Sequence, residues 1–280
     1  MNSPLEQTGT LLTRDGTRLF YREWLAEPAR AALHIVHGLG EHSGRYAHVA
    51  RRLNKHGVSV RAHDHRGHGR SHGARGALNS GSDLTADLKL VFDDFARQQR
   101  TTPFLLGHSL GGLVAADFAT ARLSPIRGLI LSSPALALAM SPGQKLLLAA
   151  TGTLAPRLAV SNGLDISAIS HDAAVVAAYR ADPLNHAKVT PRLVNYMLEA
   201  IASVQRNAMH LSIPVLLLVA GADRLVPPEG SRQFFEALPS GGGTLRWYDD
   251  SYHEVFNESA DRRARALEDL TVWLDQHMAG

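Results

Sequence analysis

The chain has 280 residues, of which 45% are hydrophobic and 20% are charged. These proportions are typical of a globular protein, and no apolar run approaches the roughly 20 residues of a membrane-spanning helix, so the composition argues against a disordered chain and an integral membrane protein. The 29 basic and 26 acidic residues leave a formal charge of only +3, which gives no reason to expect nucleic-acid binding, and the lack of cysteine excludes disulfides, thiolate catalysis and cysteine-ligated metals.

The N-terminal half alternates between short apolar runs and helical patterns. Two β-rich segments, residues 8–13 and 17–24, flank Arg14-Asp15-Gly16, and an Asp-Gly pair in this position predicts a hairpin. A buried strand over 32–37 precedes a helix that carries Tyr46, Val49 and Leu53 on one face and ends at Gly57. Further elements are predicted in the order strand 58–62, helix 83–97, strand ending at the 107–111 turn, helix 109–122 and strand 126–132. Parallel strands need such crossover helices, so the sheet is predicted to be mostly parallel.

A dense basic stretch, residues 61–75, follows the strand at 58–62 and contains four histidines. Its composition is compatible with a phosphate-binding arm or a histidine metal site. A surface loop after a buried strand explains it with fewer assumptions, because its glycines have turn spacing and Asp64 is placed to anchor the loop by backbone hydrogen bonds.

The alternation stops between residues 134 and 212, where the pattern is helical, is interrupted by prolines and shows no strand alternation. We interpret 134–212 as a helical cap inserted in the core. Its first half is strongly apolar and includes Leu146-Leu147-Leu148 and Leu154. These side chains either pack the cap onto the core or form a lipid-facing rim or tunnel.

The α/β pattern resumes with a strand over 213–220, a helix near 231–238, a strand over 244–248 and a helix over 259–277. The predicted fold class is therefore α/β, with an eight-stranded, mostly parallel sheet covered by helices on both faces. The core comprises 1–133 and 213–280. The N-terminal segment lacks the basic-then-apolar order of a secretory signal, so we expect a cytoplasmic protein.

The turn Gly107-His108-Ser109-Leu110-Gly111 connects a buried strand to a helix of small residues. A G-x-S-x-G turn in this context holds a serine on a sharp bend beside a base, and its glycines let the chain turn against a neighbouring strand. Ser109 is therefore the candidate nucleophile. The alternative is a glycine-rich turn in which Ser109 only caps the helix.

A serine nucleophile needs a base and an acid that orients the base. Asp223 follows the apolar strand that ends at 220, and His253 follows the strand that ends at 248, so both lie where the carboxyl ends of parallel strands collect catalytic groups. Asp249 and Asp250 compete with Asp223 for the role of acid, but they lie close before His253, whereas Asp223 opens a loop after a buried strand. The histidines of the cap, His171, His186 and His210, are interpreted as surface or structural residues.

The tetrahedral intermediate of acyl transfer needs two N–H donors for its oxyanion. One comes from the residue after the nucleophile, which is Leu110, and the other from the loop after an early strand, which is His37-Gly38-Leu39-Gly40. The backbone amides of Leu39 and Leu110 are therefore the candidate oxyanion hole.

Five segments together resemble the monoacylglycerol lipases of the α/β-hydrolase superfamily: residues 37–46 (HGLGEHSGRY), 63–71 (HDHRGHGRS), 107–112 (GHSLGG), 222–224 (ADR) and 252–253 (YH). The resemblance implies an α/β-hydrolase fold with a mobile apolar cap, and hydrolysis of a monoacylglycerol to glycerol and fatty acid without metal or other cofactor. It also implies that Glu41 and Arg45 lie near the polar end of the site and that Tyr179 helps to hold the glycerol.

This chain departs from the mammalian members of that family at two positions, with Phe256 where they carry a second histidine and Val226 where they carry a cysteine. A charge pair at a helix start, without substrate contact, is the other interpretation of Glu41 and Arg45. A carboxylesterase or a lysophospholipase with another head group, and a non-catalytic ligand-binding protein on the same fold, are the alternative functions. The expected partner is a small lipid ester, with transient membrane contact through the cap and no nucleic acid, while acyl length, positional preference and oligomeric state stay open.

Overall fold

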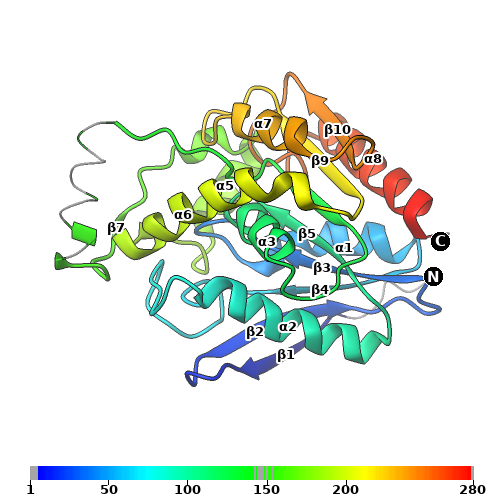
Figure 1. The fold of residues 1–280 in the computed structure, drawn as a ribbon, viewed down its shortest axis with the longest axis horizontal. Coiled ribbons are helices and arrows are strands. Elements are labelled where there is room, and N and C mark those ends of the chain that lie inside the picture. The colour runs from blue at the N-terminus through cyan, green and yellow to red at the C-terminus, as the bar shows by residue number, and fades with distance from the viewer. Residues whose placement is uncertain (1–5, 142, 144–147, 149–150, 153, 279–280) are drawn as a thin grey trace.

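An eight-stranded sheet lies at the centre of the molecule, with its strands in the order β1-β2-β4-β3-β5-β6-β9-β10 (Figure 1). The structure is a computed structural model that describes residues 6–141, 143, 148, 151–152 and 154–278. In chain order the strands of this sheet are β1 (Gln7–Leu12), β2 (Arg18–Trp24), β3 (Ala31–Val36), β4 (Val58–His63), β5 (Phe104–His108), β6 (Leu129–Ser132), β9 (Val215–Ala220) and β10 (Gly243–Tyr248).

The pairing of the strands confirms the predicted hairpin and the mostly parallel sheet. β1 pairs with β2, and β2 with β4, in antiparallel fashion, and every other pair within this sheet is parallel. In the hairpin turn the N–H of Thr13 donates to the carbonyl of Thr17 at 2.9 Å, and Gly16 adopts a φ of +81° that favours glycine. The Asp-Gly signal therefore marks a real turn.

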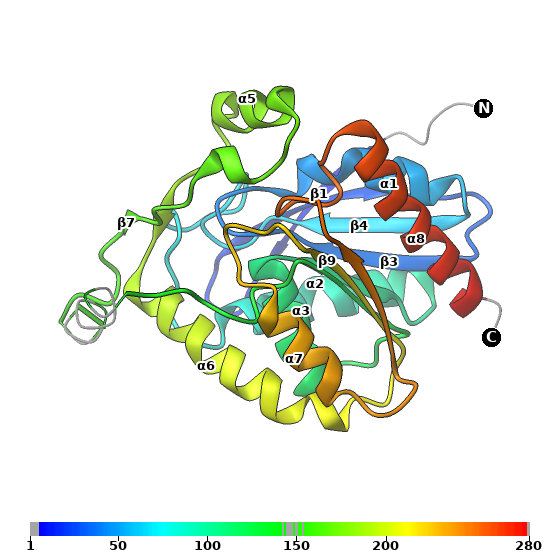
Figure 2. The same cartoon turned by 90° about the horizontal axis from the view of Figure 1, so that it is seen from above.

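Helices cover both faces of the sheet, as predicted (Figure 2). One face packs against α1 (Ala47–Asn54) and α8 (Ala260–Met278), and the other against α2 (Asp83–Gln99), α3 (Leu110–Thr120), α6 (Pro191–Asn207) and α7 (Glu229–Ala237). Most of these helices bury one apolar stripe, whereas α3 is buried on nearly all sides. In α2 that stripe includes Leu84, Leu88, Val91 and Phe95, at steps of three and four residues. A short 3₁₀ helix, η1 (Ser43–Tyr46), leads into α1.

The segment between β6 and β9, residues 134–212, contributes no strand to the large sheet among its described residues, and we call it the cap segment. It contains η2 (Ile166–Ala168), α5 (Ala173–Ala181), α6 and η3 (Ala208–His210), as well as two strands of two residues each, β7 (Val160–Ser161) and β8 (Lys188–Val189). β7 and β8 pair with each other, so the expectation that this segment has no strands is wrong at these four residues. Of the apolar residues singled out in the sequence, Leu146 and Leu147 lie outside the described residues, and Leu154 is exposed.

The part of the cap segment around α5 is hydrogen-bonded to the loop that follows β3. The Tyr179 hydroxyl and the His186 N–H both donate to the carbonyl of Gly40, at 3.1 and 2.9 Å. A side chain at Gly40 would bring its Cβ within 2.3 Å of the His186 carbonyl oxygen, so this close approach requires glycine. His42 Nε2 lies 2.9 Å from the Asp182 carboxylate and adds a further link.

The loop after β4 differs from the surface loop that its composition predicts. Its first part is buried, including Asp64, His65 and His68, and exposed positions begin only at Arg70. Asp64 anchors the loop as predicted, because its carboxylate accepts hydrogen bonds from the N–H of Ser43 at 2.8 Å and of Arg70 at 2.7 Å. Hydrophobic composition could not reveal this burial, because the polar groups are satisfied by partners distant in the sequence.

Among the described residues, no cluster of histidine and carboxylate side chains has the arrangement of a metal site. No helix that the structure describes is both long and apolar enough to cross a membrane.

Candidate active site

Ser109 lies on the sharp turn between β5 and α3. Its backbone has φ 53° and ψ −121°, a conformation that non-glycine residues seldom adopt, and the turn is fixed by a hydrogen bond from Ser109 N–H to the Ser132 carbonyl at 3.0 Å. A Cβ at Gly107 or Gly111 would lie 2.3 or 2.2 Å from a backbone oxygen. The serine side chain makes no capping hydrogen bond to α3, so the alternative interpretation of Ser109 as a helix cap is wrong. The strain instead presents the hydroxyl at the carboxyl edge of the sheet.

Asp223 and His253 meet across the loops that follow β9 and β10. His253 Nδ1 lies 2.6 Å from Asp223 Oδ2, while Asp223 Oδ1 accepts the N–H groups of Leu225 and Val226 at 2.8 and 2.9 Å. Because the carboxylate accepts, His253 carries its proton on Nδ1 and leaves Nε2 free as a base. Both side chains are buried.

The charges of this pair shift both pKa values in the directions that suit a base and its orienting acid. Burial alone would lower the pKa of His253, but the Asp223 carboxylate outweighs burial and raises it above the ordinary value. For Asp223, burial opposes ionisation, and the charge and hydrogen bond of His253 nevertheless lower its pKa. The pair therefore holds an anionic carboxylate beside an imidazole that readily accepts a proton.

The competing residues lie elsewhere. Asp250 is exposed and pairs with Arg262 at 3.1 Å, and Asp249 is also exposed. His171 Nδ1 contacts Glu258 at 2.7 Å, and the His186 ring packs on His68 with centroids 4.4 Å apart. Of the candidate acids, Asp223 is the one that contacts His253.

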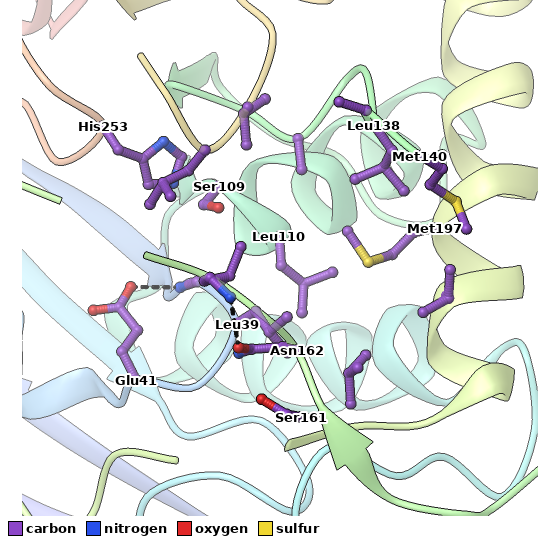
Figure 3. A pocket seen from close by; sticks show the side chains of 18 of the residues that line it. Leu39, Glu41, Ser109, Leu110, Leu138, Met140, Ser161, Asn162, Met197 and His253 are labelled. Carbon is purple, nitrogen blue, oxygen red and sulfur yellow. Dashed lines mark hydrogen bonds between the residues drawn. The ribbon is translucent and has the colours of Figure 1, made fainter. Parts of the chain in front are cut away.

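The loop after β3 brings Leu39 to the same site. Gly38 N–H donates to Glu41 Oε1 at 2.6 Å, and a Cβ at Gly38 would lie 3.2 Å from Ser109 Cβ, so the loop approaches the nucleophile closely. Leu110 is the first residue of α3, and its N–H is one of those that a helix start leaves without an intrahelical acceptor. Leu39 and Leu110 both line the cavity described below, where Ser109 lies between them and His253 (Figure 3).

The cavity has a volume of about 580 Å³ and one predominantly apolar wall. No hydrogen bond between Ser109 Oγ and His253 occurs among the described contacts, but both side chains face this cavity (Figure 3). Met197 projects into it from α6 and lies with Met140 and Leu138 on the side away from His253. Further apolar lining residues come from the cap segment and the β9 loop: Val160, Leu164, Ile166, Ile169, Val189, Val194, Leu225 and Val226. The cap segment thus supplies most of the apolar wall.

The other end of the cavity is polar and includes Glu41, Tyr179 and Glu254. Arg45 lies behind them and is not a lining residue. Its guanidinium donates to Glu41 Oε2 at 2.7 Å and forms two bonds of 2.6 Å to Glu254, and it lies 4.8 Å from the centre of the Tyr179 ring. The charge pair predicted from the sequence therefore exists, but it has a third member.

Two residues near the site escaped the sequence analysis. Glu254 carried no signal beyond its position next to His253. The His108 ring lies 4.8 Å from the His253 ring, and burial, together with the charge of His253, lowers the pKa of His108 to about 4. His108 is therefore neutral at pH 7 and adds no competing charge. Its position inside the G-x-S-x-G turn was the only available signal.

A strained serine after β5, a histidine–carboxylate pair after β10 and β9, and an eight-stranded, mostly parallel sheet define an enzyme of the α/β-hydrolase class. The profile of the serine aminopeptidase S33 family matches residues 27–260, and the chain belongs to this family.

The relatives of the chain extend over most of its length. A monoacylglycerol lipase of Mycolicibacterium smegmatis is 35% identical over 268 residues, which cover 94% of this chain and 95% of that protein. The crystal structure of a monoacylglycerol lipase of Paleococcus ferrophilus is also 35% identical, superposes with a TM-score of 0.85, and covers 92% of this chain and 99% of its own. A Bacillus subtilis protein named phospholipase YtpA is 34% identical, covering 89% of this chain and 99% of that protein.

Proposed function

We propose that the protein hydrolyses the ester bond of monoacylglycerols to glycerol and free fatty acid through an acyl-enzyme on Ser109. The observation that carries this proposal is the cavity, in which Ser109 lies between an apolar wall suited to one acyl chain and a polar end suited to a small alcohol. The relatives named monoacylglycerol lipase, which match nearly end to end, support the same substrate.

In the proposed first step, His253 Nε2 removes the proton of Ser109 as the serine oxygen attacks the acyl carbonyl carbon. The carbonyl π electrons move to the oxygen, and the resulting oxyanion accepts hydrogen bonds from the N–H groups of Leu39 and Leu110. Collapse of this intermediate breaks the bond to glycerol, and His253 gives its proton to the departing oxygen. The acyl group is then esterified to Ser109.

In the second step, water gives a proton to His253 and attacks the acyl-enzyme. Collapse of the second intermediate releases the fatty acid and returns the proton to Ser109. Asp223 holds the imidazole in the Nδ1–H tautomer and stabilises the imidazolium that forms in each step. The raised pKa of His253 fits this role.

The glycerol moiety is proposed to lie at the polar end of the cavity. Glu41 and Tyr179 line that end and supply an acceptor and a hydroxyl, and Arg45 holds both of them from behind. This assignment keeps the three residues expected from the sequence in one site. It also divides their roles, because two line the cavity and one does not.

The phospholipase relative makes a lysophospholipid the second candidate substrate. The charges at the polar end argue against it, because Glu41 and Glu254 carry two negative charges against the one positive charge of Arg45. A phosphate there would meet net repulsion, whereas an uncharged glycerol would not. A non-catalytic binding protein is disfavoured by the Asp223–His253 pair, which binding alone does not require.

The cap segment, residues 134–212, is proposed to be a domain inserted in a core of 1–133 and 213–280. A cytoplasmic protein that touches a membrane surface transiently is the proposed setting, because Leu154, Leu158 and Val160 expose apolar surface on this segment. Their exposure supports the lipid-facing rim, one of the two alternatives that the sequence left open for this segment.

Turnover of a substrate panel tests the proposal. We expect hydrolysis of monooleoylglycerol to exceed that of diacylglycerol, triacylglycerol and lysophosphatidylcholine, and Ser109→Ala to abolish both this activity and labelling by a fluorophosphonate. Activity limited to soluble aryl esters would contradict the lipid substrate. Retention of activity by Ser109→Ala would contradict the mechanism itself.

A further inference from the structure

We propose that Arg45 and Glu254 are positioning residues. Their bidentate ion pair fixes the loop after β3 (residues 37–42, the oxyanion loop), which carries the Leu39 donor, relative to the loop after β10 (residues 249–259, the base loop), which carries His253. The inference rests on the proposed function, since it assigns the base to His253 and one donor to Leu39. It adds a residue, Glu254, that neither the family resemblance nor the sequence motifs single out.

On one side, Arg45 is connected to the oxyanion loop through Glu41. Glu41 Oε1 accepts the Gly38 N–H at 2.6 Å and the Tyr46 hydroxyl at 2.7 Å, and Glu41 Oε2 accepts from Arg45 at 2.7 Å. The Gly38 amide is thereby engaged by the protein itself, and the next amide along the chain, that of Leu39, is the one left to bind the oxyanion. A displacement of Glu41 would release Gly38 and let the loop turn.

On the other side the pair grips the residue that follows His253. The two terminal guanidinium nitrogens of Arg45, Nη1 and Nη2, donate to Glu254 Oε1 and Oε2 at 2.6 Å each, in the parallel geometry that arginine makes with a carboxylate. Glu254 is held independently, because its N–H donates to the Ile169 carbonyl at 2.9 Å and its carboxylate accepts from Asn257 at 3.0 Å. Since His253 and Glu254 are consecutive, fixing one limits the movement of the other.

The pair is needed because the sheet does not fix the two loops relative to each other. β3, which leads into the oxyanion loop, and β10, which leads into the His253 loop, are separated by β5, β6 and β9 in the strand order. Backbone pairing therefore sets their distance only through three intervening strands. A direct link beside the site is the contact between Arg45 and Glu254, residues 209 positions apart in the chain. A second one, from His48 Nε2 to the Phe256 carbonyl at 2.7 Å, joins α1 to the same loop farther from His253.

The pair is also buried and touches the cap segment. The side chains of Arg45, Glu41 and Glu254 are 10%, 3% and 5% exposed, so water screens their interaction little. The guanidinium stacks on the ring of Tyr179, whose hydroxyl bonds to Gly40 in the oxyanion loop. One cation thus contacts the oxyanion loop, the base loop and α5.

The charges of this network act on His253 as well. The groups that face its imidazole are Asp223, the neutral His108, and the carboxylates of Glu254 and Glu41, with Arg45 behind them. Burial disfavours the imidazolium, and Asp223 first and then Glu254 and Glu41 raise the pKa of His253. Removing the charge of Glu254 leaves Arg45 less compensated, so the imidazolium should form less readily.

The test compares Glu254→Gln and Arg45→Lys with the control Asp87→Asn in the full-length chain. The Arg66–Asp87 pair is equally bidentate, with bonds of 2.6 and 2.7 Å, and is buried on α2 away from the cavity. Hydrolysis of p-nitrophenyl butyrate is measured per active site, with sites counted by fluorophosphonate titration, so that misfolded enzyme does not enter the rate.

We expect kcat to fall by about 10-fold to 100-fold in Glu254→Gln and Arg45→Lys, with KM changed by less than about threefold, because misplacement of catalytic groups affects the transition state more than ground-state binding. The acid limb of the pH profile of kcat/KM should also move to lower pH in Glu254→Gln. Glu254→Asp, which keeps the charge on a shorter arm, should restore the acid limb but only part of kcat. Asp87→Asn should lower thermal stability and leave kcat per site unchanged.

Two results would overturn the inference. One is a wild-type kcat per site and an unshifted acid limb in Glu254→Gln, which would make the ion pair merely structural. The other is an equal loss of kcat per site in Asp87→Asn, which would make the effect one of general destabilisation. Ser109→Ala run on the same ester separates this failure from failure of the proposed mechanism, because only the latter would leave Ser109→Ala active. The substrate panel tests the proposed lipid substrate separately.

Discussion

A group of buried histidines should make the fold labile in mild acid. His34, His37, His63, His65, His68 and His108 are buried, and burial lowers the pKa of each. The first five lie in contact with one another, with the ring centroids of neighbouring pairs from 4.4 to 5.8 Å apart. The unfolded chain binds protons at these positions near pH 6.5, while the folded protein does not.

The sign of the effect follows from that difference. For a histidine whose folded pKa lies below its unfolded pKa, stability is constant above pH 6.5 and falls as pH decreases below that value. Between pH 7.5 and 5.5, a group such as His108, with a folded pKa of about 4, costs about 1.3 kcal/mol. Each other histidine whose pKa is well below the ordinary value adds up to the same amount, and His253, whose pKa is raised, offsets about 1.4 kcal/mol at most. Five such histidines contribute up to about 6.5 kcal/mol, and the offset from His253 leaves an expected net loss of roughly 5 kcal/mol.

Urea unfolding at pH 7.5, 6.5 and 5.5 in buffers of equal ionic strength measures this loss, and the slope of the free energy of unfolding against pH counts the protons taken up. A variant carrying His34→Leu and His63→Leu, the pair joined at 2.9 Å, should reduce the slope by nearly two protons at pH 5.5, and by about one proton averaged over the range, whatever its stability at pH 7.5. A free energy of unfolding that stays constant or rises between pH 7.5 and 5.5 would refute the reasoning.

Three further outcomes follow from the site. Asp223→Asn should lower kcat/KM by about 10⁴-fold, and the acid limb of the residual activity should move to lower pH, because the carboxylate is what raises the pKa of His253. Met197→Trp should fill part of the cavity beside its apolar wall, where a long acyl chain would lie. It should therefore lower kcat/KM for monooleoylglycerol far more than for a glycerol monoacetate, as a chain-length series would show. Gly40→Ala should lower activity on both substrates, because its Cβ would meet the His186 carbonyl at 2.3 Å, whereas Gly81→Ala, which meets nothing within 4 Å, should not.

The core elements could be predicted from the sequence because local patterns decide them. The strands of the large sheet were placed to within a few residues, since buried parallel strands are short apolar runs bounded by turn residues, as in Val215–Ala220. Ser109, Asp223 and His253 each follow such a run, and this order along the chain was enough to predict the contact between Asp223 and His253. In the structure, His253 Nδ1 lies 2.6 Å from Asp223 Oδ2. Here topology converts sequence order into position, because the carboxyl ends of parallel strands share one edge.

The errors share a different cause. The loop after β4 looked exposed because it is rich in histidine and arginine. It is buried because partners from other parts of the chain satisfy its polar groups: Arg66 donates to Asp87, and Asp64 accepts from the Ser43 N–H. The β7–β8 pair was missed because two strands of two residues leave no periodicity. Neither feature is encoded within any window of neighbouring residues.

The pair of Glu41 and Arg45 shows where the two kinds of information meet. Their spacing of four residues at a helix start was compatible with a local charge pair or with a substrate site, and the sequence left both open. In the folded chain the local pair exists, with Arg45 Nη1 at 2.7 Å from Glu41 Oε2. Of the three described hydrogen bonds from Arg45 to carboxylates, however, two go to Glu254. A motif that looks local in sequence therefore makes most of its described carboxylate contacts with a residue beside His253. The sequence could not show that contact, because it forms between segments that follow β3 and β10, strands that three others separate in the sheet.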